Sequence, residues 1–171
     1  MNVDAILLTL NRHEVEYLLI GGVNFLLRHD PVLTFDIDIW IEDSPANRQR
    51  LNGTLVEMEA QWGATEKEWK AVARDAGWLE RQSVFCLTTR YGALDVFRSV
   101  KGLEGRYAEC LRMAVPAKTA TGIPYRGLSD PHMLECQLAL DETGRKPERI
   151  RRLRESLGQV QSQGGGHRGG V

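Results

Sequence analysis

Two aspartates alternate with isoleucines at positions 35–41, in the segment Phe-Asp-Ile-Asp-Ile-Trp-Ile. Because successive side chains of a strand point to opposite faces, Asp36 and Asp38 are expected on one face and the isoleucines on the other. Two carboxylates held this close repel each other, and burial adds to that cost. A divalent cation relieves both effects, and Mg²⁺ binds carboxylate oxygens together with water and substrate phosphates. The segment therefore predicts a strand that offers two ligands to Mg²⁺, or to Mn²⁺.

A third carboxylate lies in a second apolar segment, Ala-Leu-Asp-Val-Phe, which contains Asp95. If this strand lies beside the first one, three carboxylates converge on one site. Such a cluster can hold two cations, one bound to nucleotide phosphates and the other lowering the pKa of an attacking hydroxyl. Asp95 is then the residue expected to orient or deprotonate that hydroxyl. The alternative is that Asp36 and Asp38 form the solvated face of an edge strand and that Asp95 ends a hairpin strand.

A pair of glycines, Gly21 and Gly22, follows the apolar run 17–20. Glycine lets backbone amides approach an anion closely, and the start of a helix favours negative charge. Taken alone, a glycine pair at the end of a strand is an ordinary turn. Upstream of the paired aspartates, it predicts a site for phosphate.

The three motifs together are Leu-Ile-Gly-Gly-Val-Asn-Phe-Leu-Leu, Thr-Phe-Asp-Ile-Asp-Ile-Trp-Ile and Gly-Ala-Leu-Asp-Val-Phe. This set resembles the DNA polymerase β-like nucleotidyltransferase superfamily, and within it the small bacterial members found in toxin–antitoxin or phage-defence settings. The likeness extends over residues 15 to about 155. It implies an α/β fold with a small mixed sheet and flanking helices. It also implies transfer of a nucleoside monophosphate from an NTP to a hydroxyl of a protein, an RNA or a small molecule, with pyrophosphate released.

The resemblance assigns roles to individual residues. It implies that Asp36, Asp38 and Asp95 are catalytic and bind metal. The nucleotide-binding residues that it implies are Gly21, Gly22, Asn24, Thr34, Arg145 and Lys146. The partners would be the NTP and an acceptor, which could be a toxin or antitoxin protein or an RNA.

Two positions depart from the pattern of these relatives. Val32 and Gln137 stand where the relatives often carry Arg and Lys, which offer positive charge to phosphates. A basic segment near the C-terminus could compensate, or could be a solvated helix face; it contains Arg145, Lys146, Arg149, Arg151, Arg152 and Arg154. Two alternatives therefore stay open: a nucleotidyltransferase-fold protein that only binds a partner, and a nuclease that uses the same carboxylates.

The remaining sequence predicts the elements that position these residues. Apolar periodicity predicts helices at 4–14, 23–28, 46–62, 67–75, 107–113, 129–140 and 147–157. Strands are predicted at 17–20, 35–41, 84–87 and 94–97, with a second hairpin at 119–128 around Gly122. One domain over residues 1–158 is expected, with helices 129–158 appended to the sheet. The Gly-rich tail 159–171 is expected to be disordered.

Whole-chain properties limit the classes of function. The chain has 171 residues and a formal net charge of −1, so its bulk charge does not imply a nucleic-acid partner. No apolar run approaches the length of a membrane span, and the N-terminus does not resemble a secretory signal. The odd number of cysteines, at wide spacing, predicts reduced and mostly buried thiols rather than a disulfide framework or a zinc site. A cytoplasmic protein is expected, and its oligomeric state is not indicated.

Overall fold

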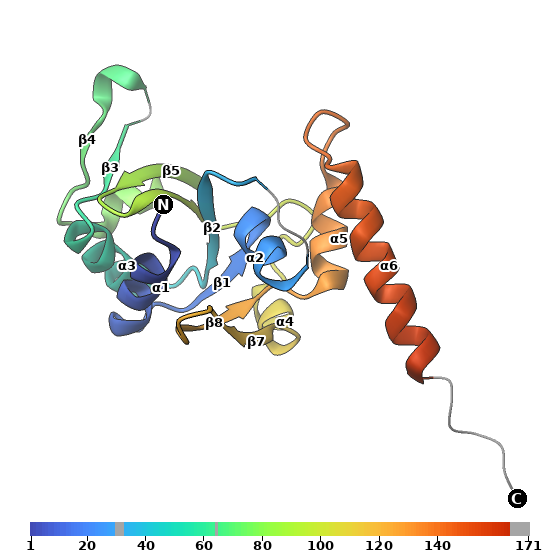
Figure 1. Ribbon diagram of the computed structural model, residues 1–171. Coiled ribbons are helices and arrows are strands. Elements are labelled where there is room, and N and C mark those ends of the chain that lie inside the picture. The colour runs from blue at the N-terminus through green and yellow to red at the C-terminus, as the bar shows by residue number, and fades with distance from the viewer. Residues whose placement is uncertain (30–32, 64, 165–171) are drawn as a thin grey trace, which may run out of the picture.

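The computed structural model describes residues 1–29, 33–63 and 65–164, which form a mixed β-sheet with helices on both faces (Figure 1). In this part of the chain the sheet has eight strands in the order β4-β3-β5-β6-β2-β1-β8-β7. The α/β class predicted from the sequence is confirmed. The helices are α1 (Val3–Arg12), α2 (Gly21–Arg28), α3 (Pro45–Glu57), α4 (Tyr107–Arg112), α5 (Asp130–Ala139) and α6 (Pro147–Gly164). The strands are β1 (Tyr17–Ile20), β2 (Asp36–Ile41), β3 (Gln61–Trp62), β4 (Lys70–Ala71), β5 (Val84–Thr89), β6 (Gly92–Phe97), β7 (Val115–Lys118) and β8 (Pro124–Gly127).

The centre of the sheet is formed by β1, β2 and β6. Strand β2 pairs antiparallel with β1 and parallel with β6. In this register Asp38 lies opposite Ile20 on one side and opposite Asp95 on the other. The pairing therefore brings the end of β1, where the glycines begin, and both acidic segments to the same level of the sheet.

Side-chain alternation along the central strands divides the core into two clusters. Ile37, Ile39 and Ile41 are fully buried in the cluster that includes residues of α1 and α3. Trp40, on the opposite face, packs with residues of α4, α5 and α6. The two aspartates of β2 lie on the face of Trp40, beyond the end of that second cluster. The predicted division between an apolar and an acidic face of this strand is confirmed.

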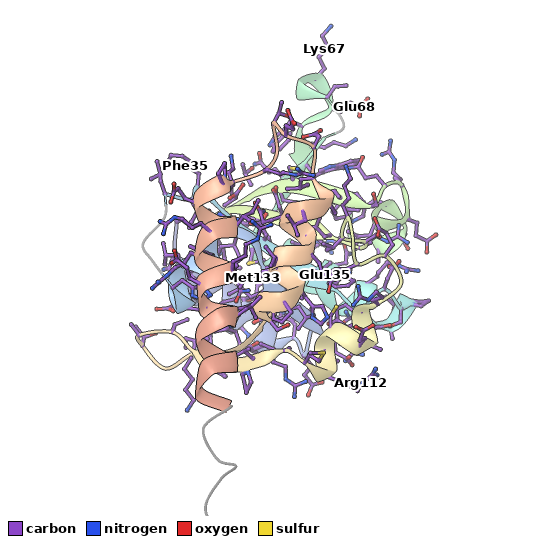
Figure 2. All side chains as sticks on the ribbon, turned by 90° about the vertical axis from the view of Figure 1, so that its right-hand side faces the viewer. Phe35, Lys67, Glu68, Arg112, Met133 and Glu135 are labelled. Carbon is purple, nitrogen blue, oxygen red and sulfur yellow. The ribbon has the colours of Figure 1, made fainter. Side chains whose placement is uncertain are left out.

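Helices α5 and α6 lie side by side over one part of the sheet, as Figures 1 and 2 show. Ser129 precedes α5 with extended backbone angles, and Pro131 lies in its first turn, where the missing N–H costs no hydrogen bond. Among the described residues, no helix is long and apolar enough to cross a membrane.

The helix predicted at 46–62 is shorter in the structure, where α3 ends at Glu57. Glu59 has a φ of 54°, which breaks the helical geometry, and the chain continues as β3. Trp62 then packs against Trp78 and Phe85, with ring centroids 5.4 Å away in both cases. Its spacing from the preceding helix had suggested helical continuation, but Trp62 belongs to a strand.

The helix predicted at 67–75 is also wrong. A 3₁₀ turn at Glu66–Glu68 leads into β4, which pairs antiparallel with β3, and a second 3₁₀ helix follows at Ala76–Glu80. The Asp75 side chain accepts the Gly77 N–H at 2.8 Å and so starts this second element. The local propensity for helix was overridden by strand pairing at the edge of the sheet.

Both hairpins are confirmed. Strands β5 and β6 are joined at Arg90 and Tyr91, and the second hairpin begins at Val115, earlier than predicted. Helix α6 continues past 157 to Gly164, so residues 159–164 of the expected disordered tail are helical, and residues 165–171 lie outside the described residues.

Candidate active site

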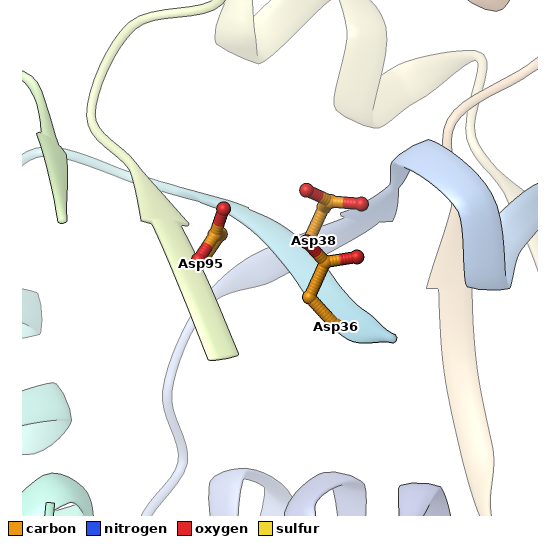
Figure 3. A group of neighbouring side chains, drawn as sticks. All are labelled: Asp36, Asp38 and Asp95. Carbon is orange, nitrogen blue, oxygen red and sulfur yellow. The ribbon is translucent and has the colours of Figure 1, made fainter. Parts of the chain in front are cut away.

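Three carboxylates converge at one end of the central strands. Asp36 and Asp38 come from β2 and Asp95 comes from β6, and one oxygen from each lies within 4.8 Å of the others (Figure 3). All three side chains are partly exposed. The convergence follows from the parallel pairing of β2 with β6, which places Asp38 and Asp95 on neighbouring strands at the same level and on the same face.

Each carboxylate has few hydrogen-bond partners within the protein. Asp38 accepts the Gly22 N–H at 3.3 Å, and Asp36 accepts the Thr34 hydroxyl at 3.2 Å. The Cys86 thiol lies 3.4 Å from an Asp95 oxygen. None of the three carboxylates forms an ion pair with a residue in the described ranges. Most of their lone pairs are therefore available to a ligand.

Crowding and burial change the proton affinity of this group. Burial, with a further contribution from the Asp36 charge, raises the pKa of Asp38 to about 6. Burial also raises the pKa of Asp95, and the Asp36 charge acts in the same direction. The folded protein thus holds negative charges together at a cost that an added cation would remove.

This cost predicts a pH dependence of the metal-free protein. The pKa of Asp38 is raised to about 6 in the fold, well above that of an aspartate in an unfolded chain, so the folded state binds a proton more tightly than the unfolded state. The contribution of this group to the free energy of unfolding is therefore present below about pH 4 and lost as the pH rises to about 6. Asp38→Asn removes the titration, and its stabilisation relative to wild type should grow over this interval by up to about 3 kcal/mol.

The measurement is urea unfolding of both proteins in EDTA at a series of pH values. A difference in unfolding free energy that stays constant from about pH 4 to pH 7 contradicts the prediction. Glu142→Gln, which neutralises an exposed carboxyl group in the loop between α5 and α6, is the matched control for the loss of one carboxylate.

The glycine pair begins α2 in close contact with the carboxylates. Gly21 has a φ of +63°, which side-chain-bearing residues rarely adopt. A Cβ at this position would lie 1.9 Å from Asp38 Oδ2, and one on Gly22 would lie 2.6 Å from Thr34 Oγ1. Only residues without a side chain permit this approach. The first amides of α2 are therefore held beside the acidic cluster, where the positive end of a helix favours an anion.

Thr34 closes the other side of the glycine turn. Its hydroxyl lies 3.2 Å from both the backbone carbonyl oxygen and a side-chain oxygen of Asp36. Since this hydroxyl also lies against Gly22, Thr34 links the turn to the first carboxylate. The structure brings together Gly21, Gly22, Thr34 and the three aspartates.

A cation from the last helix also reaches this point. Arg149 of α6 has its guanidinium carbon 5.3 Å from the centre of the Phe25 ring, and its Nη2 would lie 3.6 Å from a Cβ on Gly22. Its Nε is buried and has no hydrogen-bond partner in the described part of the chain. Burial lowers the pKa of Arg149 and the Asp38 charge opposes this shift. Sequence reasoning had placed Arg149 in the basic segment without assigning it to the site.

Other residues implied by the resemblance lie elsewhere. Asn24 is fully buried and donates to the Leu128 carbonyl at 2.9 Å, so its amide holds β8 to α2. Arg145 donates to the carbonyls of Leu138 and Leu140, both at 2.8 Å, and thereby caps α5.

Lys146 begins the turn into α6. Its backbone N–H donates to Gln137 Oε1 at 3.0 Å, so the glutamine that replaces a basic residue of the relatives holds this turn. Neither Lys146 nor Arg145 has a contact with the aspartates or the glycine pair among these bonds. Val32 lies outside the described residues.

Cys86 is a neighbour of the site that sequence reasoning missed. It is exposed and lies directly opposite Asp95 in the β5–β6 pairing, although a mostly buried thiol was expected. Partial burial and the charge of Asp95 raise the pKa of the Cys86 thiol to about 11, so it donates to the carboxylate as a neutral group. Only the strand register, which the sequence suggests through hairpin length, could have revealed this contact.

Solved nucleotidyltransferase structures share this fold. The lincomycin-bound lincosamide antibiotic adenylyltransferase LnuA has a TM-score of 0.57 and 17% identity, covering 88% of this chain and 92% of its own. The antibiotic-resistance factor ANT(2'')-Ia has a TM-score of 0.54 and 13% identity, covering 91% and 82%. A candidate nucleotidyltransferase from Thermotoga maritima has a TM-score of 0.50 and 16% identity, covering 91% and 89%.

At such low identity, the likeness establishes architecture rather than activity. No protein-family model and no curated protein matches the sequence. The agreement covers most of each chain. The chain thus shares the overall fold of these solved nucleotidyltransferase structures, in agreement with the fold predicted from its glycine and aspartate motifs.

Proposed function

We propose that this protein is a metal-dependent nucleotidyltransferase that transfers a nucleoside monophosphate from an NTP to a hydroxyl group. The observation that carries the proposal is the convergence of Asp36, Asp38 and Asp95 within 4.8 Å, beside the glycine turn that begins α2. The shared fold supports the same class of reaction.

The donor set fits a hard divalent cation. It consists of carboxylate oxygens with few internal partners, which suits Mg²⁺ or Mn²⁺ better than a metal that prefers sulfur or imidazole. When bound, such a cation would neutralise phosphate charge and lower the pKa of the acceptor hydroxyl. Asp36 and Asp38 would hold it from one strand and Asp95 from the next.

The residues around the carboxylates suggest which side of the cluster receives the triphosphate and which side receives the acceptor. The Gly22 side of Asp38 offers the amides of α2 and the guanidinium of Arg149, which bind the triphosphate. Asp95 lies across the cluster from this turn and faces the acceptor. Its raised pKa, caused mainly by burial, suits a group that takes up a proton.

The reaction is an in-line displacement at the α-phosphorus. The acceptor oxygen forms a bond to the α-phosphorus as its proton passes to Asp95. The bond from that phosphorus to the oxygen bridging the β-phosphate breaks, and pyrophosphate leaves with the bonding electrons. Arg149 and the α2 amides stabilise the negative charge on the departing group.

The acceptor is a hydroxyl compound of one of three classes. The resemblance to small bacterial relatives favours a partner protein of a toxin–antitoxin pair, or an RNA. Two structural neighbours are instead a lincosamide antibiotic adenylyltransferase with lincomycin bound and an antibiotic-resistance factor, which favours a small molecule. Incubation with NTPs labelled at the α-phosphate and Mg²⁺, with each acceptor class in turn, distinguishes them by the product that carries label.

The alternative of a partner-binding protein without turnover rested on the missing basic residues. Arg149 weakens that reading because it supplies positive charge at the glycine turn from a different position. A nuclease is disfavoured for a similar reason, since an anion site built around Gly21 and Gly22 serves a free triphosphate. Nucleic acid cleaved without added NTP would reverse this preference.

Arg149→Met tests the proposed phosphate contact. The variant keeps the packing on Phe25 but loses the charge, so the KM for NTP should rise by about 10- to 100-fold, as expected for a charged hydrogen bond of roughly 1.5–3 kcal/mol. Steady-state transfer and calorimetric NTP binding with Mg²⁺ are the measurements.

Arg154→Met is the matched control because Arg154 lies on the exposed side of the same helix. It should bind NTP as the wild type does. Equal NTP affinity in Arg149→Met and wild type would show that Arg149 does not contribute to nucleotide binding.

A further inference from the structure

Asp130, the first residue of α5, joins three helices through its buried carboxylate. Its Oδ1 accepts Arg28 Nη2 at 2.6 Å and lies 3.1 Å from His29 Nε2. Its Oδ2 accepts the Ser156 hydroxyl of α6 at 2.8 Å. The side chains of Asp130 and Arg28 are 11% and 15% exposed, so this ion pair is shielded from water and less screened than a surface pair. One carboxylate therefore connects α2, α5 and α6.

The face of α6 that carries Ser156 also carries Arg149, the cation at the candidate active site. We call this face the inner stripe of α6. Arg149, Leu153 and Ser156 recur at steps of four and three residues, which places them on one face of a helix. Leu153 is fully buried in the second core cluster, so this face is the one that packs on the protein. Arg149 and Ser156 are about 10 Å apart along the helix axis.

The inner stripe of α6 contacts helix α2 near both of its ends, directly through Arg149 and indirectly through Ser156. At the start of α2, Gly22 lies beside Arg149 Nη2, and the same guanidinium packs over Phe25 in the middle of the helix. At its end, Arg28 binds Asp130, which in turn binds Ser156. A change in the placement of α6 at Ser156 would therefore move Arg149 relative to Gly22.

We propose that Asp130 and Ser156 are positioning residues that set α6 on α2 and so hold the Arg149 guanidinium at the nucleotide phosphates. The inference rests on the proposed function, because it assigns to the pair an effect on NTP binding through Arg149. The hydrogen bond between them lies about 10 Å along α6 from Arg149. Its effect reaches the site only through the helix.

The test is a double-mutant cycle between Ser156→Ala and Arg149→Met, with the Mg²⁺ complexes of ATP, GTP, CTP and UTP as probes. Ser156→Ala alone should weaken the binding of the preferred NTP by about three- to tenfold, the range of one typical intramolecular hydrogen bond. In the Arg149→Met background the same change should have no effect on affinity, since the positioned group is absent.

Thr121→Val is the matched control for stability. Thr121 donates to Asp4 Oδ2 at 2.7 Å, a hydroxyl-to-carboxylate bond like that of Ser156, but it joins α1 to the β7–β8 turn. Loss of this bond should lower the melting temperature without changing NTP affinity. A loss of affinity in Thr121→Val equal to that in Ser156→Ala would show that general destabilisation explains both, and would overturn the proposal.

Two further results separate this inference from the proposed function. If Arg149→Met weakens NTP binding while Ser156→Ala does not, or if the two effects simply add, the positioning role is wrong and the phosphate contact stands. If none of the four nucleotides binds the wild type, the proposed function itself is wrong, and the positioning role falls with it.

Discussion

Asp38→Asn is expected to reduce nucleotide transfer by about 10³-fold or more, corresponding to roughly 4 kcal/mol of lost transition-state stabilisation. The substitution keeps the size of the side chain and an oxygen that can accept the Gly22 N–H. It removes one of the three negative charges of the cluster, at the position of β2 that lies directly opposite Asp95. Initial rates of label transfer from an α-labelled NTP at saturating Mg²⁺ provide the measurement.

The loss of activity should accompany a gain in stability. The same variant relieves like-charge repulsion, so it should unfold at higher urea concentration than wild type near neutral pH when metal is removed. A structural role for Asp38 predicts the opposite change in stability. Glu142→Gln controls for a general effect of losing one carboxylate, and transfer in Asp38→Asn at the wild-type rate would exclude this site as the active centre.

Gly21→Ala is expected to reduce transfer by about 10²-fold or more, the usual cost of displacing a reacting group by about 1 Å. The new Cβ would lie 1.9 Å from Asp38 Oδ2, so either the carboxylate or the start of α2 must move. The left-handed backbone adds a strain of about 1–2 kcal/mol in the native state. Transfer rate and melting temperature, measured on the same preparation, report the two effects separately.

Gly105→Ala separates the effect of left-handed backbone strain from the effect of the clash between the new Cβ and Asp38. Gly105 has a φ of +73°, close to that of Gly21, but a Cβ there would meet nothing within 4 Å. This control should lose a similar amount of stability and keep full activity. If Gly21→Ala transfers nucleotide as fast as Gly105→Ala, the close contact between the glycine turn and Asp38 is not needed for catalysis.

The local part of the site could be predicted from the sequence. Alternation in the segment 35–41 requires Asp36 and Asp38 to share a face, whatever surrounds the strand. That Asp95 joins them was a prediction about strand pairing, and the convergence is confirmed by the parallel register of β2 and β6. The catalytic role of the three residues stays a prediction.

Other features depended on tertiary structure that a single sequence does not reveal. Arg149 reaches the glycine turn from a helix more than a hundred positions later, and nothing in the spacing of the basic segment distinguishes it from Arg145. Strands β3 and β4 have two residues each, too short for any periodicity to separate them from helix. Asn24 lies two positions after Gly22 but is fully buried.

The parallel pairing of β2 with β6 has one more consequence, for the rigidity of the centre. Neighbouring strands lie about 4.8 Å apart because the ladder of main-chain hydrogen bonds fixes their spacing. The distance between the Cα atoms of Asp38 and Asp95 is therefore set by backbone pairing rather than by a flexible loop. The backbone spacing of these two residues is therefore set during folding and does not have to be established when a substrate arrives.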